Sequence, residues 1–109
     1  MPLHLPKPIE IYMSAENARD TSLLVACFAP DAIVKDEGRT MTGLKAIEAW
    51  KRETSEKYRH TIEPVAVAER DGQTVVTSKL SGNFPGSPVT LDFVFQLQGA
   101  KITALEIQS

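Results

Sequence analysis

Asp36 carries a carboxylate on the apolar face of an expected strand. It follows Ala32 and Val34 at alternate positions, so the three side chains share one face of that strand. A carboxylate that points into apolar surroundings is a candidate for acid–base chemistry in a pocket. Asp36 also stands beside a turn at Gly38, where an Asp commonly caps the backbone. Both roles fit the pattern.

Tyr12 is the second candidate for chemistry. It recurs with Ile9 and Met13 at three- and four-residue spacing, which places its ring on the apolar stripe of a helix. Such a tyrosine either packs as an aromatic with its hydroxyl satisfied or directs the hydroxyl at a ligand.

The remaining reactive side chains form no familiar arrangement. Cys27, the only cysteine, has apolar neighbours and is expected to be a small buried hydrophobe. His4 and His60 are far apart and have no carboxylate or thiol at ligand spacing, so we expect no metal site, and His60 is read as solvated or hydrogen-bonded. The sequence has no glycine-rich phosphate loop and no Ser/Cys/His nucleophile pattern, which argues against nucleotide and acyl-enzyme mechanisms and predicts no cofactor.

Composition limits the classes of protein further. The chain has 109 residues and a mass of 12.0 kDa, which fits one domain over residues 1–109. Its formal net charge is −2 without a basic run, so nucleic-acid binding is not expected. Apolar stretches such as Leu23–Ala29 are too short to span a membrane, and residues 1–8 do not resemble a signal peptide. A cytoplasmic protein is expected.

Hydrophobic spacing predicts helices in the first half of the chain. A helix is expected over residues 8–17, and Asp20 can cap a short second helix whose apolar face includes Phe28 and which ends at Pro30. A hairpin should follow, with strands at 32–36 and 39–42. A third helix is expected over 44–57, with Ile47 and Trp50 on one side and Lys51 among the polar residues of the other sides.

From His60 onward the spacing changes to a period of two, and three turn signals divide four strands. In the third of these strands Leu91, Phe93, Phe95 and Leu97 share one face, so Asp92 should point the opposite way. Helices followed by an antiparallel meander indicate an α+β fold.

The order of these elements, together with particular residues, resembles the nuclear transport factor 2-like superfamily and, within it, the SnoaL-like group of small bacterial proteins. The residues that carry this resemblance are Phe28–Ala32, Asp36–Arg39, Gly43, Ile47, Trp50, Asn83–Pro88 and Lys101–Ile107. The resemblance implies a cone in which three N-terminal helices pack in a strongly bent antiparallel sheet. It also implies an apolar pocket at the wide end and a homodimer that packs through the outer face of the sheet.

Ketosteroid isomerases of this superfamily use a carboxylate base at the end of the first strand, a tyrosine of the first helix and a protonated Asp on a later strand. By resemblance, Asp36 falls at the base, Tyr12 at the tyrosine and Asp92 at the second Asp. Asp36 could instead be held in a surface ion pair by the charged residues of the following loop, among which Arg39 could be its partner; Arg39 is otherwise expected to be a solvated hairpin residue. The apolar walls of the implied pocket are Phe28, Val34, Trp50 and Phe93.

Two hypotheses about function follow, because members of this superfamily differ widely in activity. The first is a cofactor-independent isomerase, cyclase or hydrolase that acts on a small hydrophobic ligand, with Asp36 as general base and Tyr12 as hydrogen-bond donor. The second is a non-catalytic binding or accessory domain whose pocket is filled by its own side chains.

Overall fold

The computed structural model describes residues 4–57 and 59–108. Its three helices are α1 (Lys7–Ala18), α2 (Thr21–Ala26) and α3 (Leu44–Lys57). Its six strands are β1 (Phe28–Asp36), β2 (Arg39–Thr42), β3 (His60–Arg70), β4 (Gln73–Gly82), β5 (Val89–Gln98) and β6 (Lys101–Gln108). In the described part of the chain, no helix has the length and apolar character needed to cross a membrane.

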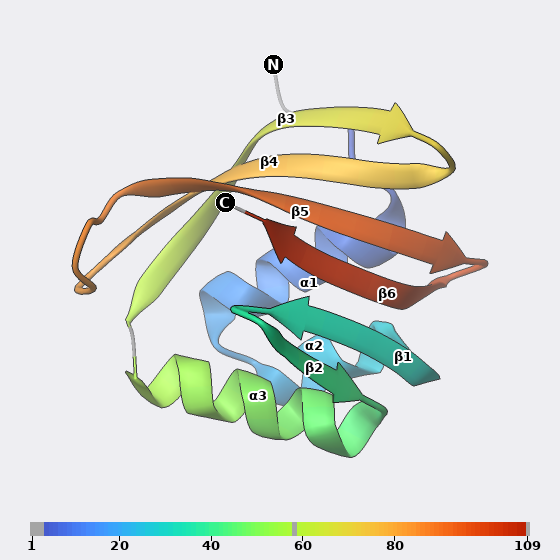
Figure 1. Ribbon diagram of the computed structural model, residues 1–109, viewed down its shortest axis with the longest axis horizontal. Coiled ribbons are helices and arrows are strands. Elements are labelled where there is room, and N and C mark those ends of the chain that lie inside the picture. The colour runs from blue at the N-terminus through green and yellow to red at the C-terminus, as the bar shows by residue number, and fades with distance from the viewer. Residues whose placement is uncertain (1–3, 58, 109) are drawn as a thin grey trace.

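The sheet is strongly bent and mixed, and the helices lie against its concave side (Figure 1). The strand order is β2-β1-β6-β5-β4-β3. Strands β3 to β6 form the expected antiparallel meander, and β1 and β2 form the expected hairpin. The hairpin joins the meander by a parallel pairing of β1 with β6. The predicted α+β fold is confirmed, and the one parallel pair makes its sheet mixed rather than wholly antiparallel.

The helices α1 and α3 lie where hydrophobic spacing predicts them. The expected cap of α2 is also present, because the backbone N–H of Leu23 donates to Asp20 Oδ1 at 3.0 Å. The expectation that α2 continues to Pro30 was wrong, since the helix ends at Ala26 and Phe28 already begins β1. Phe28 pairs with Ile102 of β6, and this strand pairing outweighs the helical spacing of the local apolar residues.

Alternation along β5 sorts its side chains as expected. Phe93 and Phe95 are buried, whereas Asp92 lies on the opposite face. There Asp92 Oδ1 accepts a hydrogen bond of 2.8 Å from the Thr77 hydroxyl of the neighbouring strand. The Asp92 carboxylate is therefore hydrogen-bonded to Thr77 on the outer face of the sheet.

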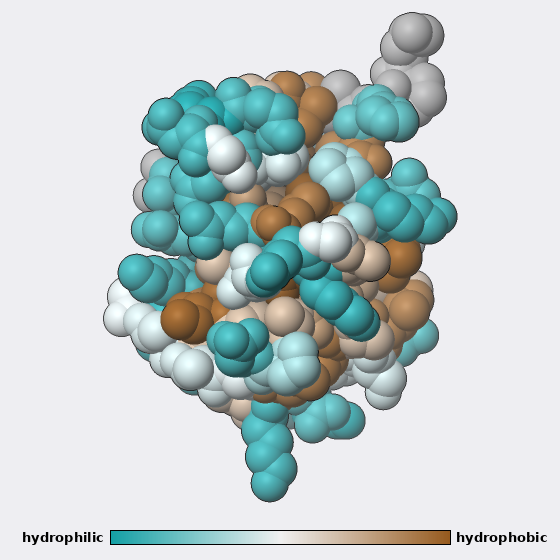
Figure 2. Space-filling view, turned by 90° about the vertical axis from the view of Figure 1, so that its right-hand side faces the viewer, coloured by the Kyte–Doolittle hydropathy of each residue, from teal (hydrophilic) through white to brown (hydrophobic). Residues whose placement is uncertain are grey.

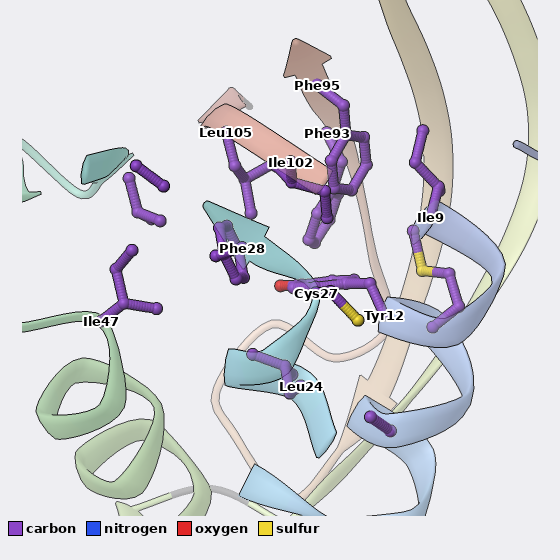
Figure 3. Close-up of a cluster of buried hydrophobic side chains, with 14 of the residues drawn as sticks. Ile9, Tyr12, Leu24, Cys27, Phe28, Ile47, Phe93, Phe95, Ile102 and Leu105 are labelled. Atoms are coloured by element: carbon purple, nitrogen blue, oxygen red, sulfur yellow. The ribbon is translucent and has the colours of Figure 1, made fainter. Parts of the chain in front are cut away.

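The hydrophobic core lies between the helices and the concave face of the sheet. Figure 3 shows Tyr12 extending from α1 into the centre of this core. Its ring makes edge contacts with Phe28, Phe93 and Phe95, at centroid distances of 6.1, 6.3 and 5.5 Å. Cys27 is buried at the edge of the same cluster, as expected.

The end of the molecule that carries the β3–β4 and β5–β6 turns has a mixed surface. Figure 2 looks onto this end, where hydrophilic side chains project around smaller areas of apolar surface. The turns reverse the strands, and the candidate site lies toward the other end of the sheet.

Candidate active site

A cavity of about 470 Å³ lies at the end of the sheet opposite these turns. It is bounded by the turn between β1 and β2, the second half of α3, the start of β3 and the segment that joins β4 to β5. These elements meet at the left of Figure 1. The apolar side chains of its wall include Ile62, Leu80, Val89, Leu91, Phe93 and Ile107.

Asp36 and Trp50 stand together on the cavity wall. The indole Nε1–H of Trp50 donates to Asp36 Oδ2 at 3.0 Å, which fixes the orientation of the carboxylate. Asp36 is half-buried, and the two residues before it on the same strand face, Ala32 and Val34, are fully buried. No hydrogen bond to Asp36 Oδ1 is present among the described residues, so this oxygen can accept from a ligand.

Arg39 does not pair with Asp36. Its guanidinium lies 3.3 Å from a carboxylate oxygen of Glu53 on α3, and both side chains are more than half exposed. Arg39 therefore forms its surface ion pair with Glu53 and not with Asp36. The pair lies at the rim of the cavity, where both residues contribute to its lining.

The predicted site residues fall into two groups. Asp36, Trp50 and Phe93 line the cavity. Tyr12, Phe28 and Val34 are buried in the adjoining core and are not among the residues that line it. The ring of Phe93 touches both regions, because it lines the cavity and contacts Tyr12.

The Tyr12 hydroxyl is buried without a hydrogen-bond partner in the described part of the chain. Burial raises the pKa of Tyr12 well above its usual value of 10.0, and the negative charges of Glu16 and Asp36 raise it further. The hydroxyl is therefore protonated and able to donate.

Sequence reasoning missed a buried ionic cluster in the cavity wall. It is formed by Glu16 of α1, Lys51 of α3 and His60 of β3. Glu16 Oε2 accepts from Lys51 Nζ at 2.7 Å, and Glu16 Oε1 lies 3.0 Å from His60 Nε2. The side chains are only 3%, 7% and 12% exposed, respectively, and all three residues line the cavity. We call this set the Glu16 cluster.

One signal for this cluster was present in the sequence. Glu16 continues the stripe of Tyr12 and Met13 along α1, and a carboxylate on a buried stripe requires a partner. Lys51 was expected on a polar side of α3, but it is buried because its ammonium reaches Glu16 and lies 4.2 Å from the centroid of the Trp50 ring. The polar partner of His60 comes from a helix 44 residues earlier, so local spacing could not reveal it.

Glu16 is ionised in this setting. Burial raises its pKa, but the hydrogen bond from His60 and the charge and hydrogen bond of Lys51 outweigh burial. The pKa falls to about 2, from a usual value of 4.5. An ionised Glu16 can only accept, so His60 Nε2 carries the proton that it donates to Glu16.

The cavity thus combines an apolar wall with one oriented carboxylate and one buried ionic cluster. Within residues 4–57 and 59–108, no group of three or more His, Cys, Asp or Glu side chains is arranged to hold a metal ion. The cavity therefore presents both hydrogen-bond acceptors and hydrogen-bond donors beside apolar surface.

Comparison with known proteins identifies relatives of the chain. The SnoaL-like domain family model matches residues 9–105. A candidate polyketide cyclase from Sinorhizobium meliloti (protein SMa1630) is 38% identical, with 95% of each chain covered and a TM-score of 0.91.

More distant structures share the fold alone. A Catenulispora acidiphila protein with a ketosteroid isomerase-like fold, solved in complex with trimethylamine, is 19% identical, with 97% of this chain and 87% of that one covered and a TM-score of 0.84. A candidate polyketide cyclase from Pseudomonas putida (pp0894) is 15% identical, with 99% and 92% covered and a TM-score of 0.79. Among curated proteins no match was found.

Proposed function

Because the chain belongs to the SnoaL-like domain family, we propose that it is a cofactor-independent acid–base catalyst that acts on a small apolar carbonyl-type compound. Asp36 is the general base. The observation that carries this proposal is the hydrogen bond from Trp50, which orients the Asp36 carboxylate on an apolar cavity wall. A general base must be held in hydrogen-bond reach of the proton that it removes, and the Trp50 hydrogen bond holds the Asp36 carboxylate in one orientation on the wall.

The size and polarity of the cavity agree with this role. Its volume of about 470 Å³ is within the range of small-molecule sites. The apolar wall formed by β3, β4, β5 and β6 would hold a hydrocarbon ring, and Asp36 would meet one edge of that ring. Within the family, this chemistry covers isomerases, cyclases and hydrolases without a cofactor.

A generic substrate tests Asp36 without knowledge of the natural one. In 5-nitrobenzisoxazole a base removes the proton on C3, the electrons of the C–H bond form the nitrile, the N–O bond breaks and the oxygen leaves as a phenolate. We expect the wild-type protein to open this ring with saturation kinetics. Asp36→Asn should abolish this activity while leaving the fold intact.

Glu37→Gln is the matched control, because it removes a carboxylate from the adjacent position on the rim of the cavity. Its activity should stay close to that of the wild-type protein. Equal activity of the wild-type protein and Asp36→Asn would refute Asp36 as the base.

The packing of Tyr12, Phe28 and Val34 favours a second candidate function. All three side chains are buried in the core, so the interior around them is filled by the protein itself. A non-catalytic binding domain would have this property and would bind small apolar compounds without converting them. A thermal-shift screen of hydrophobic carbonyl, epoxide and steroid-like compounds separates the two functions when each compound that binds is then tested for turnover.

A further inference from the structure

Burial of the charged side chains of the Glu16 cluster is energetically unfavourable, and packing alone does not explain why they are charged. Glu16 and Lys51 are both buried, and burial of two charges removes hydration that their mutual attraction restores only in part. An apolar pair of similar volume generally stabilises such a position as well or better. Strongly perturbed ionisable groups in a cavity wall often belong to a functional site.

The unused hydrogen-bonding capacity of the cluster is on the donor side. Both oxygens of Glu16 are engaged, one by Lys51 and the other by His60. The Lys51 ammonium has three N–H groups, and within the described residues only the one that meets Glu16 has a protein acceptor. The cluster therefore offers the cavity a donor, while its carboxylate is already satisfied.

Trp50 lies between this donor and the proposed base. Its Nε1–H meets Asp36, while its ring face lies 4.2 Å from Lys51 Nζ. The acceptor Asp36 and the donor Lys51 thus contact the same indole ring, and both residues line the same cavity.

From this geometry we propose that Lys51 binds the acceptor oxygen of the ligand, with Glu16 and Trp50 as its positioning residues. The ligand class is an apolar ring compound with a carbonyl or acidic hydroxyl oxygen, bound with that oxygen at Lys51 and with an adjacent acidic C–H at Asp36. The assignment deepens the proposed function and rests on it for the C–H group. It places the cationic donor for a developing oxyanion at Lys51 in the cavity wall, a role that family resemblance alone would give to Tyr12.

Binding of 4-nitrophenol tests Lys51 without any turnover, because the visible absorbance of the phenolate reports its ionisation directly. We expect the wild-type protein to bind the phenolate at least about tenfold more tightly than the neutral phenol, as hydrogen bonds to charged groups allow. The apparent pKa of bound 4-nitrophenol should then lie below its value in water.

The variant Lys51→Met should abolish this preference. Since loss of Lys51 alone leaves Glu16 buried without its cation, the double variant Glu16→Gln/Lys51→Met provides a second test with the charges removed together. Arg52→Met is the matched control, because it removes a cation from the next residue of α3, whose exposed side chain pairs with Glu48 outside the cavity. It should bind the phenolate as the wild-type protein does.

The outcomes separate this inference from the proposed function. An unchanged preference in the double variant, or a wild-type protein that binds no 4-nitrophenolate, overturns the assignment of Lys51. Loss of phenolate preference in the double variant, combined with full ring-opening activity in Asp36→Asn, would support Lys51 as the oxygen-binding residue and reject Asp36 as the base.

Discussion

At the scale of single residues, Glu16 and Lys51 form a buried ion pair in which each charge compensates the other. Their 2.7 Å contact is almost fully shielded from water, so the loss of one partner leaves the other charge buried and unpaired. We expect Lys51→Met to lower the free energy of unfolding by about 3–5 kcal/mol. Urea denaturation at neutral pH measures this loss.

The double variant Glu16→Gln/Lys51→Met should be more stable than Lys51→Met alone, because it leaves no unpaired charge in the core. Arg52→Met should stay within about 0.5 kcal/mol of the wild-type protein, since its ion pair is exposed. A double variant as unstable as Lys51→Met would show that packing of the lysine side chain, rather than charge pairing, dominates.

The depressed pKa of Glu16 predicts an acid-dependent loss of stability. A carboxyl group with a pKa of about 2 when folded and about 4.5 when unfolded stabilises the fold above about pH 4.5. This stabilisation, on the order of 3 kcal/mol, should be lost as the pH falls from about 4.5 to 2. Denaturation midpoints measured across this range should therefore fall steeply.

Glu16→Gln should reduce this loss of stability at low pH. Glu10→Gln, which alters an exposed carboxylate of the same helix, should show the same loss as the wild-type protein. If the denaturation midpoints of both variants fell at low pH as steeply as that of the wild-type protein, other carboxyl groups would account for the acid sensitivity.

Tyr12 allows a separate test of the hydroxyl in the core. Because no described residue accepts from this hydroxyl, Tyr12→Phe removes a buried polar group and leaves no lost partner behind. We expect stability to be unchanged or to rise by up to about 1 kcal/mol, as measured by the urea midpoint. A marked loss of 5-nitrobenzisoxazole turnover in the same variant would instead support Tyr12 as a catalytic donor.

Sequence reasoning identified three of the residues that line the cavity, Asp36, Trp50 and Phe93, because some of the signals for them are local. Strand alternation oriented Asp36 correctly, since its face is shared with two apolar neighbours. Lys51 was misplaced because helical spacing treats a lysine as polar and cannot foresee that its ammonium reaches a carboxylate on another helix. Ion pairs between residues that are distant in the sequence leave no signal in local residue spacing.

At the scale of elements, the start of β3 depends on a close backbone approach from Gly82 of β4. A Cβ at position 82 would overlap the carbonyl oxygen of Arg59 and would lie 2.9 Å from Cα of His60. Only glycine fits there without a backbone shift. His60 begins β3 and belongs to the Glu16 cluster, so this contact also helps to position the cluster.

We therefore expect Gly82→Ala to displace the first residues of β3 and to destabilise the protein by about 1–3 kcal/mol. The imidazole NMR signals of His60 should shift as well. Ser81→Ala, at the preceding position of β4, is the control and should leave these signals in place. Unchanged His60 signals in Gly82→Ala would show that the strands separate without moving the cluster.

The boundaries of the elements show how far local patterns extend. The bounds of α3 match the expected 44–57. Gly43 precedes this helix, and Leu44, Ile47 and Trp50 recur at three-residue spacing in its first half. The boundary between α2 and β1 was misplaced, because Cys27 and Phe28 continue the apolar spacing of the helix although Phe28 pairs with β6. Strand pairing between distant segments decides such a boundary.

At the scale of the whole molecule, the outer face of the sheet is expected to form a homodimer interface. On β5 this outer face carries the exposed Thr90 and Gln96 together with the half-buried Asp92 and Val94, so its surface is partly apolar. Sedimentation at micromolar concentration should give a species of twice the chain mass. Val94→Lys should shift it toward the monomer, whereas Leu23→Lys, at an exposed position on α2, should not.

The parallel pairing of β1 with β6 also has a consequence for synthesis of the chain. The β1–β2 hairpin leaves the ribosome long before β6, the strand that connects it to the rest of the sheet. Until β6 emerges, the apolar faces of α1 and α2 have no complete sheet to cover them. Contacts between such distant segments slow folding, so these apolar faces are exposed to aggregation until β6 has been made.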